Sequence, residues 1–297
     1  MTESEWLAST DQQAMLRYLT VGSPGSVPET TSDRKLRLFA VACCRSVWYL
    51  LTDPRSRHAV EVAERWCDDE VTGDAFLRAR EDCSGCPPYN YVWNALTHAA
   101  SGASNAIANA VTLHRPAEVA ALLREIFGNP FHPLGMWAGD RRGNIFHWFA
   151  GPGAVTLRPD WLTPQVRAIA AAAYAERVSG RCGRCGGSGD ADWLDGNEKY
   201  IPCPDCHGTG RIERGHLDGD RLAVLADCLE DNGCDNEDIL MHLRGKERCF
   251  CHTSSVQVVR DAGAYWGCYK CNGTGWTALR GPHVRGCWVV DLLLGKE

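Results

Sequence analysis

Three stretches of the chain repeat one eight-residue pattern of cysteine and glycine. They are CGRCGGSG at 182–189, CPDCHGTG at 203–210 and CYKCNGTG at 268–275, and each reads Cys-x-x-Cys-x-Gly-x-Gly. Two residues between the cysteines let both thiolates reach one ion from a tight turn, and Zn²⁺ prefers four such soft ligands in a tetrahedron. The glycines that follow permit positive φ, so the chain can turn back. Each octet therefore predicts half of a zinc site.

The first two octets together supply a complete ligand set. The segment between them, DADWLDGNEKYIP, is long enough to form a hairpin. Two matched cysteine pairs are a specific signal for metal binding. Four thiolates close the coordination shell and leave no position for water, so a hydrolytic zinc is not expected. We expect the first site to consist of Cys182, Cys185, Cys203 and Cys206.

The third octet has no matching octet beside it. Its cysteines, Cys268 and Cys271, need two further ligands. The nearest candidates are Cys249 and Cys251 in KERCFCHTSS, a less usual Cys-x-Cys pair, which leaves open that His252 replaces one of them. The intervening SSVQVVRDAGAYWG predicts a β-hairpin. The second site would then be a small zinc ribbon, and the chain would bind two zinc ions.

Disulfides and free buried thiols are the competing interpretations of the 16 cysteines. The first thirty residues lack the basic region and apolar run of a signal peptide. No apolar run reaches the roughly 18 residues that a membrane span needs. We therefore expect a cytoplasmic protein without a membrane partner, and a reducing cytosol favours metal binding. The net charge of −6 argues against a chain built throughout to bind polyanions.

The octets resemble the cysteine-rich zinc-binding region of the DnaJ (Hsp40) co-chaperones. That region carries Cys-x-x-Cys-x-Gly-x-Gly in four copies and binds two zinc ions; here three copies stand beside the divergent Cys249/Cys251 pair. The resemblance covers about 70 residues. The His-Pro-Asp loop of a J-domain is missing, since the nearest match is His132-Pro133-Leu134. The resemblance implies two zinc sites and gives no support for action through Hsp70.

Helical signals fill the remainder of the chain. Asp53-Pro54, Pro116 and Thr163-Pro164 are typical helix starts, Gly128 a typical helix end, and Thr10 with Gln13 a capping box. In 32–51 an apolar stripe recurs at helical spacing through Leu36, Phe39, Ala40, Cys43, Val47 and Leu50. Helices are expected within 12–19, 32–51, 54–69, 91–113, 117–127, 165–178, 219–233 and 235–245.

The expected fold class is mainly α, an irregular multi-helix domain with two small zinc-binding β-hairpin or ribbon insertions. Residues 129–160 mix Gly and Pro with Trp and Phe, which predicts an ordered loop anchored by aromatic rings. The division we expect is a helical scaffold (1–180), a DnaJ-type zinc insertion (181–214), a helical pair continuing the scaffold (215–245), a zinc-ribbon insertion (246–280) and a C-terminal segment packing on the scaffold (281–297).

A second resemblance covers most of the chain outside the cysteine-rich segments. DRKLRLFAVACCRSVW, ALLREIFGNPF, WLTP, LADCLEDNGCDNEDIL and the ending GPHVRGCWVVDLLLGKE are similar to a family of bacterial proteins typical of planctomycetes. Proteins of this kind run from the helix after WLTP almost directly into LADCLED, and from the DNEDIL helix into GPHVRGCWVV. The resemblance implies that 181–214 and 246–280 are insertions, and it carries over no activity.

Other reactive residues are weaker signals. Cys83-Ser-Gly-Cys86 reads as a pair of ordinary, partly buried thiols, with a redox pair or half a metal site left open. His283 precedes Cys287 by four residues, which leaves open a Cys–His nucleophile pair. The chain contains no phosphate-binding glycine loop, nucleophile elbow or His-Glu-x-x-His.

The leading hypothesis is a non-enzymatic protein that presents two structural zinc modules to another protein. One alternative is nucleic-acid binding through 246–280, where basic and aromatic side chains interleave into a weak basic patch; these are Lys246, Arg248, Arg260, Lys270, Arg280, Tyr265, Trp266 and Trp276. Another alternative is a chaperone-like or thiol-redox role, in which zinc release exposes thiolates.

Overall fold

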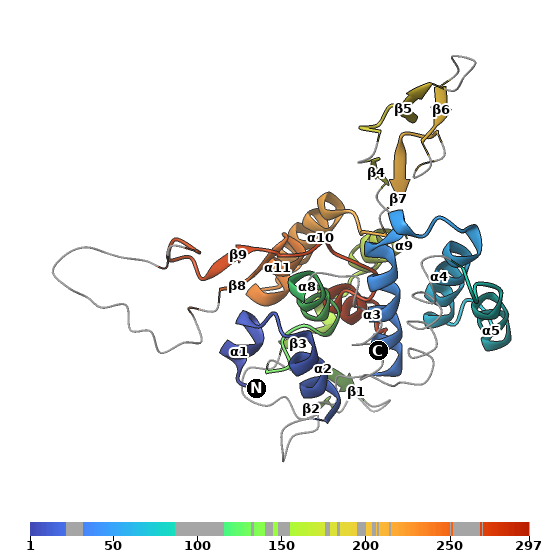
Figure 1. The fold of residues 1–297 in the computed structure, drawn as a ribbon. Helices are drawn as coiled ribbons and strands as arrows, with labels where there is room; N and C mark the ends of the chain where they lie inside the picture. Colours follow the sequence, from blue (N-terminus) through green and yellow to red (C-terminus); the bar gives the residue numbers. More distant parts are fainter. Residues whose placement is uncertain are drawn as a thin grey trace. The chain divides into compact units, whose positions relative to one another are not determined.

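Helices make up most of the structure, a computed structural model of the chain (Figure 1). It describes residues 1–21, 32–86, 116–131, 134–139, 145–147, 155–175, 179–182, 185–194, 200–203, 206, 208–213, 215–249, 251, 268 and 270–296. The mainly α fold class is confirmed, with ten α-helices in these residues. The chain forms two units. Unit 1 comprises Met1–Ser32, Arg115–Ala175 and Asp218–Glu297, and unit 2 comprises Asp33–His114 and Glu176–Leu217.

Unit 1 is a helical assembly. Its helices are α1 (Glu3–Ala8), α2 (Gln12–Val21), α8 (Pro116–Phe127), α9 (Pro164–Ala175), α10 (Gly219–Asp231), α11 (Glu237–Leu243) and α12 (Trp288–Leu294), with a 3-10 turn, η2 (Pro159–Trp161). Helix α2 contacts α8, α9 contacts α10 and α12, and α12 also contacts α8 and α11. Trp6, Leu123, Ile126, Leu225 and Val289 are among the side chains buried between them.

The predicted end of α8 is confirmed at Gly128, which has φ +67°. A Cβ at this position would lie 3.2 Å from the Trp288 ring, so glycine lets α12 pack closely there. The start of α2 differs from the prediction. The side chain of Asp11, rather than Thr10, accepts hydrogen bonds from the first-turn amides. The capping box belongs one helix earlier, between Thr2 and Glu5.

Short strands interrupt the segment predicted as an irregular loop, and that prediction was incomplete. Within 129–160 lie β1 (Leu134–Gly139), β2 (Ile145–His147) and β3 (Val155–Leu157), in the order β2-β1-β3. β1 is antiparallel to β2 and parallel to β3. Runs of three to six residues among glycines are too short to show a two-residue alternation, which explains the omission.

Unit 2 contains a three-helix cluster and the first cysteine-rich segment. The helices are α3 (Asp33–Ser46), α4 (Pro54–Cys67) and α5 (Gly73–Asp82), with a 3-10 turn, η1 (Trp48–Leu50), after α3. The predicted start of α4 is confirmed, because the Asp53 side chain accepts from the Arg55 amide. The α3 stripe is buried except for Leu50, which is 37% exposed because α3 ends at Ser46 and η1 turns the next residues.

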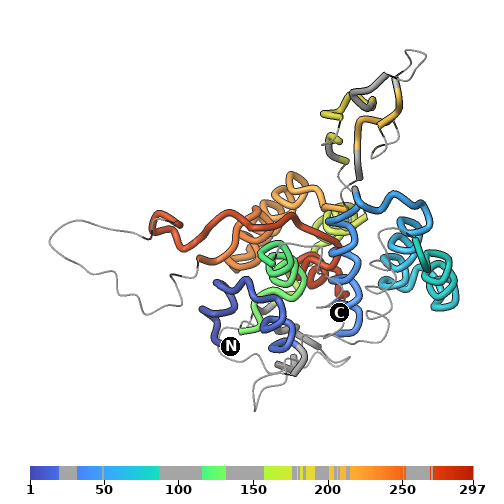
Figure 2. The backbone as a smooth tube through the Cα atoms, viewed as in Figure 1, coloured from blue at the N-terminus to red at the C-terminus, as the bar shows by residue number. Residues whose placement is uncertain are grey.

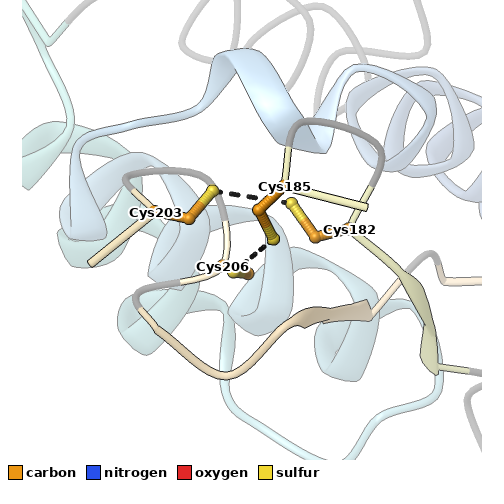
Figure 3. A group of neighbouring side chains, drawn as sticks. All are labelled: Cys182, Cys185, Cys203 and Cys206. Carbon is orange, nitrogen blue, oxygen red and sulfur yellow. Dashed lines mark hydrogen bonds between the residues drawn. The ribbon is translucent and has the colours of Figure 1, made fainter. Parts of the chain in front are cut away.

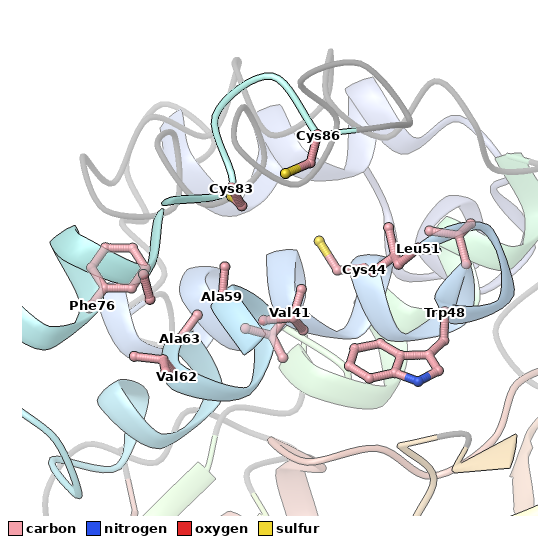
Figure 4. Close-up of a cluster of buried hydrophobic side chains, with 13 residues drawn as sticks. Val41, Cys44, Trp48, Leu51, Ala59, Val62, Ala63, Phe76, Cys83 and Cys86 are labelled. Atoms are coloured by element: carbon pink, nitrogen blue, oxygen red, sulfur yellow. The ribbon is translucent and has the colours of Figure 1, made fainter. Parts of the chain in front are cut away.

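The core of the three-helix cluster is apolar and rich in thiols (Figure 4). Val41, Trp48, Ala59 and Phe76 pack in it with the buried Cys44, Cys83 and Cys86. At its border, Arg45 of α3 forms a buried ion pair with Glu64 of α4 at 2.6 Å, and the guanidinium lies 4.3 Å from the Trp48 ring centre. This ion pair joins α3 to α4.

Three small antiparallel ribbons accompany the cysteines. In unit 2, β4 (Ser179–Arg181) pairs with β7 (Arg211–Glu213), and β5 (Asp190–Leu194) pairs with β6 (Tyr200–Pro202) (Figure 1). The hairpin predicted between the first two octets is thus confirmed as β5–β6. In unit 1, β8 (Lys246–Arg248) pairs with β9 (Trp276–Ala278). The expected helix at 91–113 and the hairpin inside 254–267 lie outside the described residues. No helix among the described residues is long and apolar enough to span a membrane.

Candidate metal centres

The first predicted ligand set comes together in unit 2 (Figure 3). Cys182 follows β4 and Cys203 follows β6, so each ribbon delivers one octet. The Sγ–Sγ distance is 3.7 Å for Cys182–Cys203 and 3.7 Å for Cys185–Cys206, and all four sulfurs lie within 4.8 Å of one another. A disulfide would need about 2.05 Å. A zinc tetrahedron with Zn–S of about 2.3 Å has edges of about 3.8 Å. The sulfurs are spaced for a metal ion such as zinc.

The glycines join the two octets into a nearly twofold arrangement. The Gly189 amide donates to Cys185 Sγ at 3.3 Å, and the Gly210 amide donates to Cys206 Sγ at 3.2 Å. In return, the carbonyl of Gly210 accepts from the Cys182 amide, and that of Gly189 from the Cys203 amide. The last glycine of each octet therefore supports a sulfur in its own octet and a backbone amide in the other.

A side chain at either of these glycines would collide with the backbone. Gly189 and Gly210 have φ of +87° and +69°. A Cβ at Gly189 would lie 2.3 Å from the Gly208 carbonyl oxygen, and one at Gly210 would lie 2.2 Å from that of Gly187. These positions require glycine both for conformation and for space.

The octets contain a further element that the pattern Cys-x-x-Cys-x-Gly-x-Gly leaves out. The hydroxyls of Ser188, Thr209 and Thr274 donate to the carbonyls of the second cysteines at 3.0, 2.7 and 2.6 Å respectively. All three occupy the position between the two glycines, so a recurring Ser or Thr was the available signal. These bonds hold the turn in which the second cysteine of each octet sits.

Electrostatics favour a thiolate at Cys185 in the first group. Burial acts to raise the pKa of Cys185, but backbone amides of Gly189 and Gly187, together with the neighbouring thiols, lower the pKa to about 6. A thiol with this pKa is mostly ionised at neutral pH, and the thiolate is the form that binds metal.

The second group forms in unit 1 with the same kind of backbone hydrogen bond. Cys249 follows β8, and its amide donates to the Gly275 carbonyl at 2.8 Å, as the cysteine amides of the first group do to theirs. The Sγ–Sγ distances are 3.7 Å for Cys249–Cys268 and 3.5 Å for Cys251–Cys271. The four sulfurs again lie within 4.8 Å of one another, so the Cys-x-Cys pair completes this octet's set.

In the second group, the pKa values of two cysteines shift in opposite directions. Backbone amides of Cys271 and Lys270 lower the pKa of Cys268 to about 7. Burial and the neighbouring thiols raise the pKa of Cys251. His252, the alternative ligand, lies outside the described residues. The ligand roles of the eight cysteines stay a prediction that the spacing supports.

The other cysteines belong to neither of these groups. Cys83 and Cys86 are buried in the core of unit 2, and burial raises the pKa of both thiols. Cys287 and His283, four residues apart in the sequence, are buried in unit 1 beside Glu125 and His242. Sequence reasoning singled out Cys287 and His283 and missed Glu125 and His242, which come from separate helices.

Comparisons of the chain with protein-family models, with curated proteins and with solved structures gave no match. The class that fold and sites define is a mainly helical protein with two buried four-cysteine groups suited to metal ions such as zinc.

Proposed function

We propose that the chain is a non-enzymatic zinc-binding protein whose helical scaffold presents two structural zinc modules to another protein. The first cysteine module is residues 181–214, and the second is residues 246–280. The observation that carries the proposal is the placement of eight sulfurs in two groups, each within 4.8 Å. Four thiolates fill a zinc shell and leave no position for a reacting water, which favours a structural role.

The interior of the first cysteine module supports a structural metal. Its buried cluster, within the described residues, consists of Cys182, Cys203 and Cys206, with Cys185 packed against them. Strands of three to five residues around such a cluster bury little apolar surface. Segments of this kind gain their folding free energy from the metal.

The two resemblances refine the proposal. The octets resemble the cysteine-rich region of DnaJ-type co-chaperones, and the remaining segments resemble the planctomycete-type family. The division of the chain into scaffold, two insertions and C-terminal segment is part of this proposal. So is a cytoplasmic location, where thiolates stay reduced.

Protein is favoured over nucleic acid because two of the described basic side chains near the second group, Arg248 and Arg280, are engaged internally. Arg248 pairs with Asp238 and lies 4.8 Å from the centre of the Trp276 ring. Arg280 pairs with Glu247 and donates to the Leu7 carbonyl. A nucleic-acid interface would need such cations directed at phosphates. In the first cysteine module, Ile201 is 42% exposed and offers an apolar contact for a protein.

Elemental analysis of the full chain, purified without added metal, tests the metal sites. Cys203→Ser and Cys271→Ser should each lower the zinc content by about one equivalent relative to the unchanged chain. Cys234→Ser, which removes a buried cysteine outside both groups, should leave it unchanged. Unchanged zinc in either ligand variant would contradict the corresponding site.

Affinity capture from a bacterial extract tests the interaction. A partner held by the unchanged chain and by Cys234→Ser should be lost with Cys203→Ser or Cys271→Ser. Capture that is independent of both ligand variants would contradict a role for the modules. Salt-sensitive retention of nucleic acid, removed by nuclease together with any bound protein, would favour the nucleic-acid alternative.

A further inference from the structure

Four buried metal-ligating side chains that belong to neither cysteine group meet inside unit 1. Glu125 comes from α8 and His242 from α11, while His283 and Cys287 flank the turn that starts α12. These three helices lie together in the backbone view (Figure 2). One donor atom from each residue lies within 4.8 Å of the others, and the residues are between 0% and 6% exposed. Two His, one Cys and one carboxylate are ligands that Zn²⁺ accepts.

The distances approach those of a tetrahedral shell. Nε2 of His242 lies 3.3 Å from Cys287 Sγ and 3.3 Å from Glu125 Oε2. Nδ1 of His283 lies 3.0 Å from Glu125 Oε1 and 4.0 Å from Cys287 Sγ. A zinc with bonds of about 2.0 to 2.3 Å separates its ligand atoms by about 3.3 to 3.8 Å. Small side-chain adjustments would therefore admit an ion.

Hydrogen bonding within the group is incomplete. Oε2 of Glu125 is buried and has no hydrogen-bond partner, although His242 Nε2 is close to it. A buried carboxylate oxygen without a partner is costly, because it loses its hydration. A metal ion at the centre of the group would accept a lone pair from this oxygen.

Charge balance points the same way. With a metal bound, the Glu125 carboxylate and the Cys287 thiolate would carry two negative charges beside two neutral imidazoles, and a divalent cation would cancel them. The neighbouring cation Arg124 is directed elsewhere, since its guanidinium donates to the carbonyls of Trp6 and Ser9. With zinc bound, the group would be neutral inside an apolar core.

We propose that Glu125, His242, His283 and Cys287 bind a third zinc ion. The ion would tie α8, α11 and the start of α12 together in the core of unit 1. Four protein ligands close the shell, so this zinc is structural. The centre of the His242 ring lies 5.1 Å from that of the Trp288 ring and 5.0 Å from that of the His283 ring, so the three rings pack closely at the site. The proposal is independent of the interaction proposed above.

A nucleophilic role for Cys287 fits the geometry less well. Its Sγ is 4.0 Å from His283 Nδ1, and that nitrogen is already 3.0 Å from Glu125. Cys287 is 0% exposed, so a substrate would not reach the sulfur.

The first test is zinc content of the full chain by elemental analysis. Cys287→Ala should lose about one equivalent of zinc, and His283→Gln should do the same. The double variant Cys203→Ser with Cys287→Ala should lose about two, because the sites are separate. The matched control is Cys234→Ala, a buried cysteine of unit 1 outside all three donor groups, which should lose none. A folded Cys287→Ala with unchanged zinc would overturn the proposal.

X-ray absorption at the zinc edge covers the case in which the variants fail to fold. In the unchanged chain, three sites would give an average shell of about three sulfurs and one nitrogen or oxygen per ion. A shell of four sulfurs alone would mean that the group holds no zinc and would overturn the proposal. A mixed shell with both cysteine groups intact would support it, even if the interaction proposal had failed.

Discussion

The cysteine groups and the mixed group of unit 1 are assembled in opposite ways. Cys182 and Cys203 are 21 residues apart, and both belong to copies of one octet. Glu125 and His283 are 158 residues apart and share no motif. The octets orient their own sulfurs through local amides and glycines. The mixed group depends on the packing of α8, α11 and α12, so its ligands meet only after the helices have docked.

This difference predicts different roles for the metal. In the first cysteine module the described buried cluster is the four-cysteine group itself, so a metal bound there would create the local fold. In unit 1 the mixed group lies among buried side chains such as Leu123, Ile126 and Val289. A metal there would strengthen an existing core rather than create it.

Chelation should separate the two cases with the largest effect. Removal of zinc is expected to abolish amide protection in β4–β7, because structural zinc in small fingers contributes about 10–16 kcal/mol of apparent binding free energy. Helices α8, α10 and α11 should keep protection. Hydrogen exchange with and without chelator measures both regions. Persistence of amide protection in β4–β7 of the metal-free chain would contradict the expected difference between the first cysteine module and the helices of unit 1.

Thiol reactivity should show a second large difference. On chelation without denaturant at pH 8, the eight cysteines of the two groups should become reactive. Burial raises the pKa of Cys44 and of Cys67 to about 12. At pH 8, well below these values, both thiols remain protonated, so they should react only after denaturation. A timed thiol titration followed by peptide mapping checks the order, and early labelling of Cys44 would contradict it.

A glycine substitution should break the local assembly of the first group. Gly210→Ala places a Cβ 2.2 Å from the Gly187 carbonyl oxygen at positive φ, so loss of about one zinc equivalent is expected. Gly186→Asn is the matched control. Gly186 has open space around it, and Asn272 occupies the same octet position in the third copy with φ +49°. Equal zinc content in both variants would refute the steric explanation.

Loss of an octet hydroxyl should have the smallest effect. Thr209→Val removes the hydroxyl's bond to the Cys206 carbonyl and the bond that it accepts from the Arg211 amide. Thr274→Val removes the counterparts at Cys271 and Trp276. Each hydrogen bond contributes about 1 kcal/mol. We expect zinc to be retained but released several-fold faster to a chelator, each time from the affected group only. Thr277→Val serves as the control, because this β9 hydroxyl lies outside the octet and donates to the Glu247 carbonyl at 3.4 Å. Identical release from all three variants would contradict the assigned role.

Prediction from the sequence succeeded where one local rule decides the structure. Asp53-Pro54 starts α4 and Gly128 ends α8, because each acts through its own backbone. It failed where neighbours compete. The side chain of Asp11, rather than that of Thr10, caps the start of α2. Leu50 does not continue the buried stripe of α3, because that helix ends four residues before it. The strands within 129–160 were missed because their pairing partners, not their residues, define them.

The sequence by itself determined the halves of the two cysteine groups, since Cys-x-x-Cys and its glycines bring two sulfurs together within a single turn. It also indicated the limits of α4, α8 and α10 to within two residues, whereas α1, α5 and α12 were not expected. The sequence likewise indicated Cys249 and Cys251 as the nearest partners of the third octet, with His252 left open. Only the tertiary structure decided that Glu125 and His242 join His283 and Cys287. The physical reason is the distance along the chain over which each feature is determined. Local backbone geometry is encoded over a few residues, whereas the meeting of side chains on separate helices depends on how whole apolar faces pack.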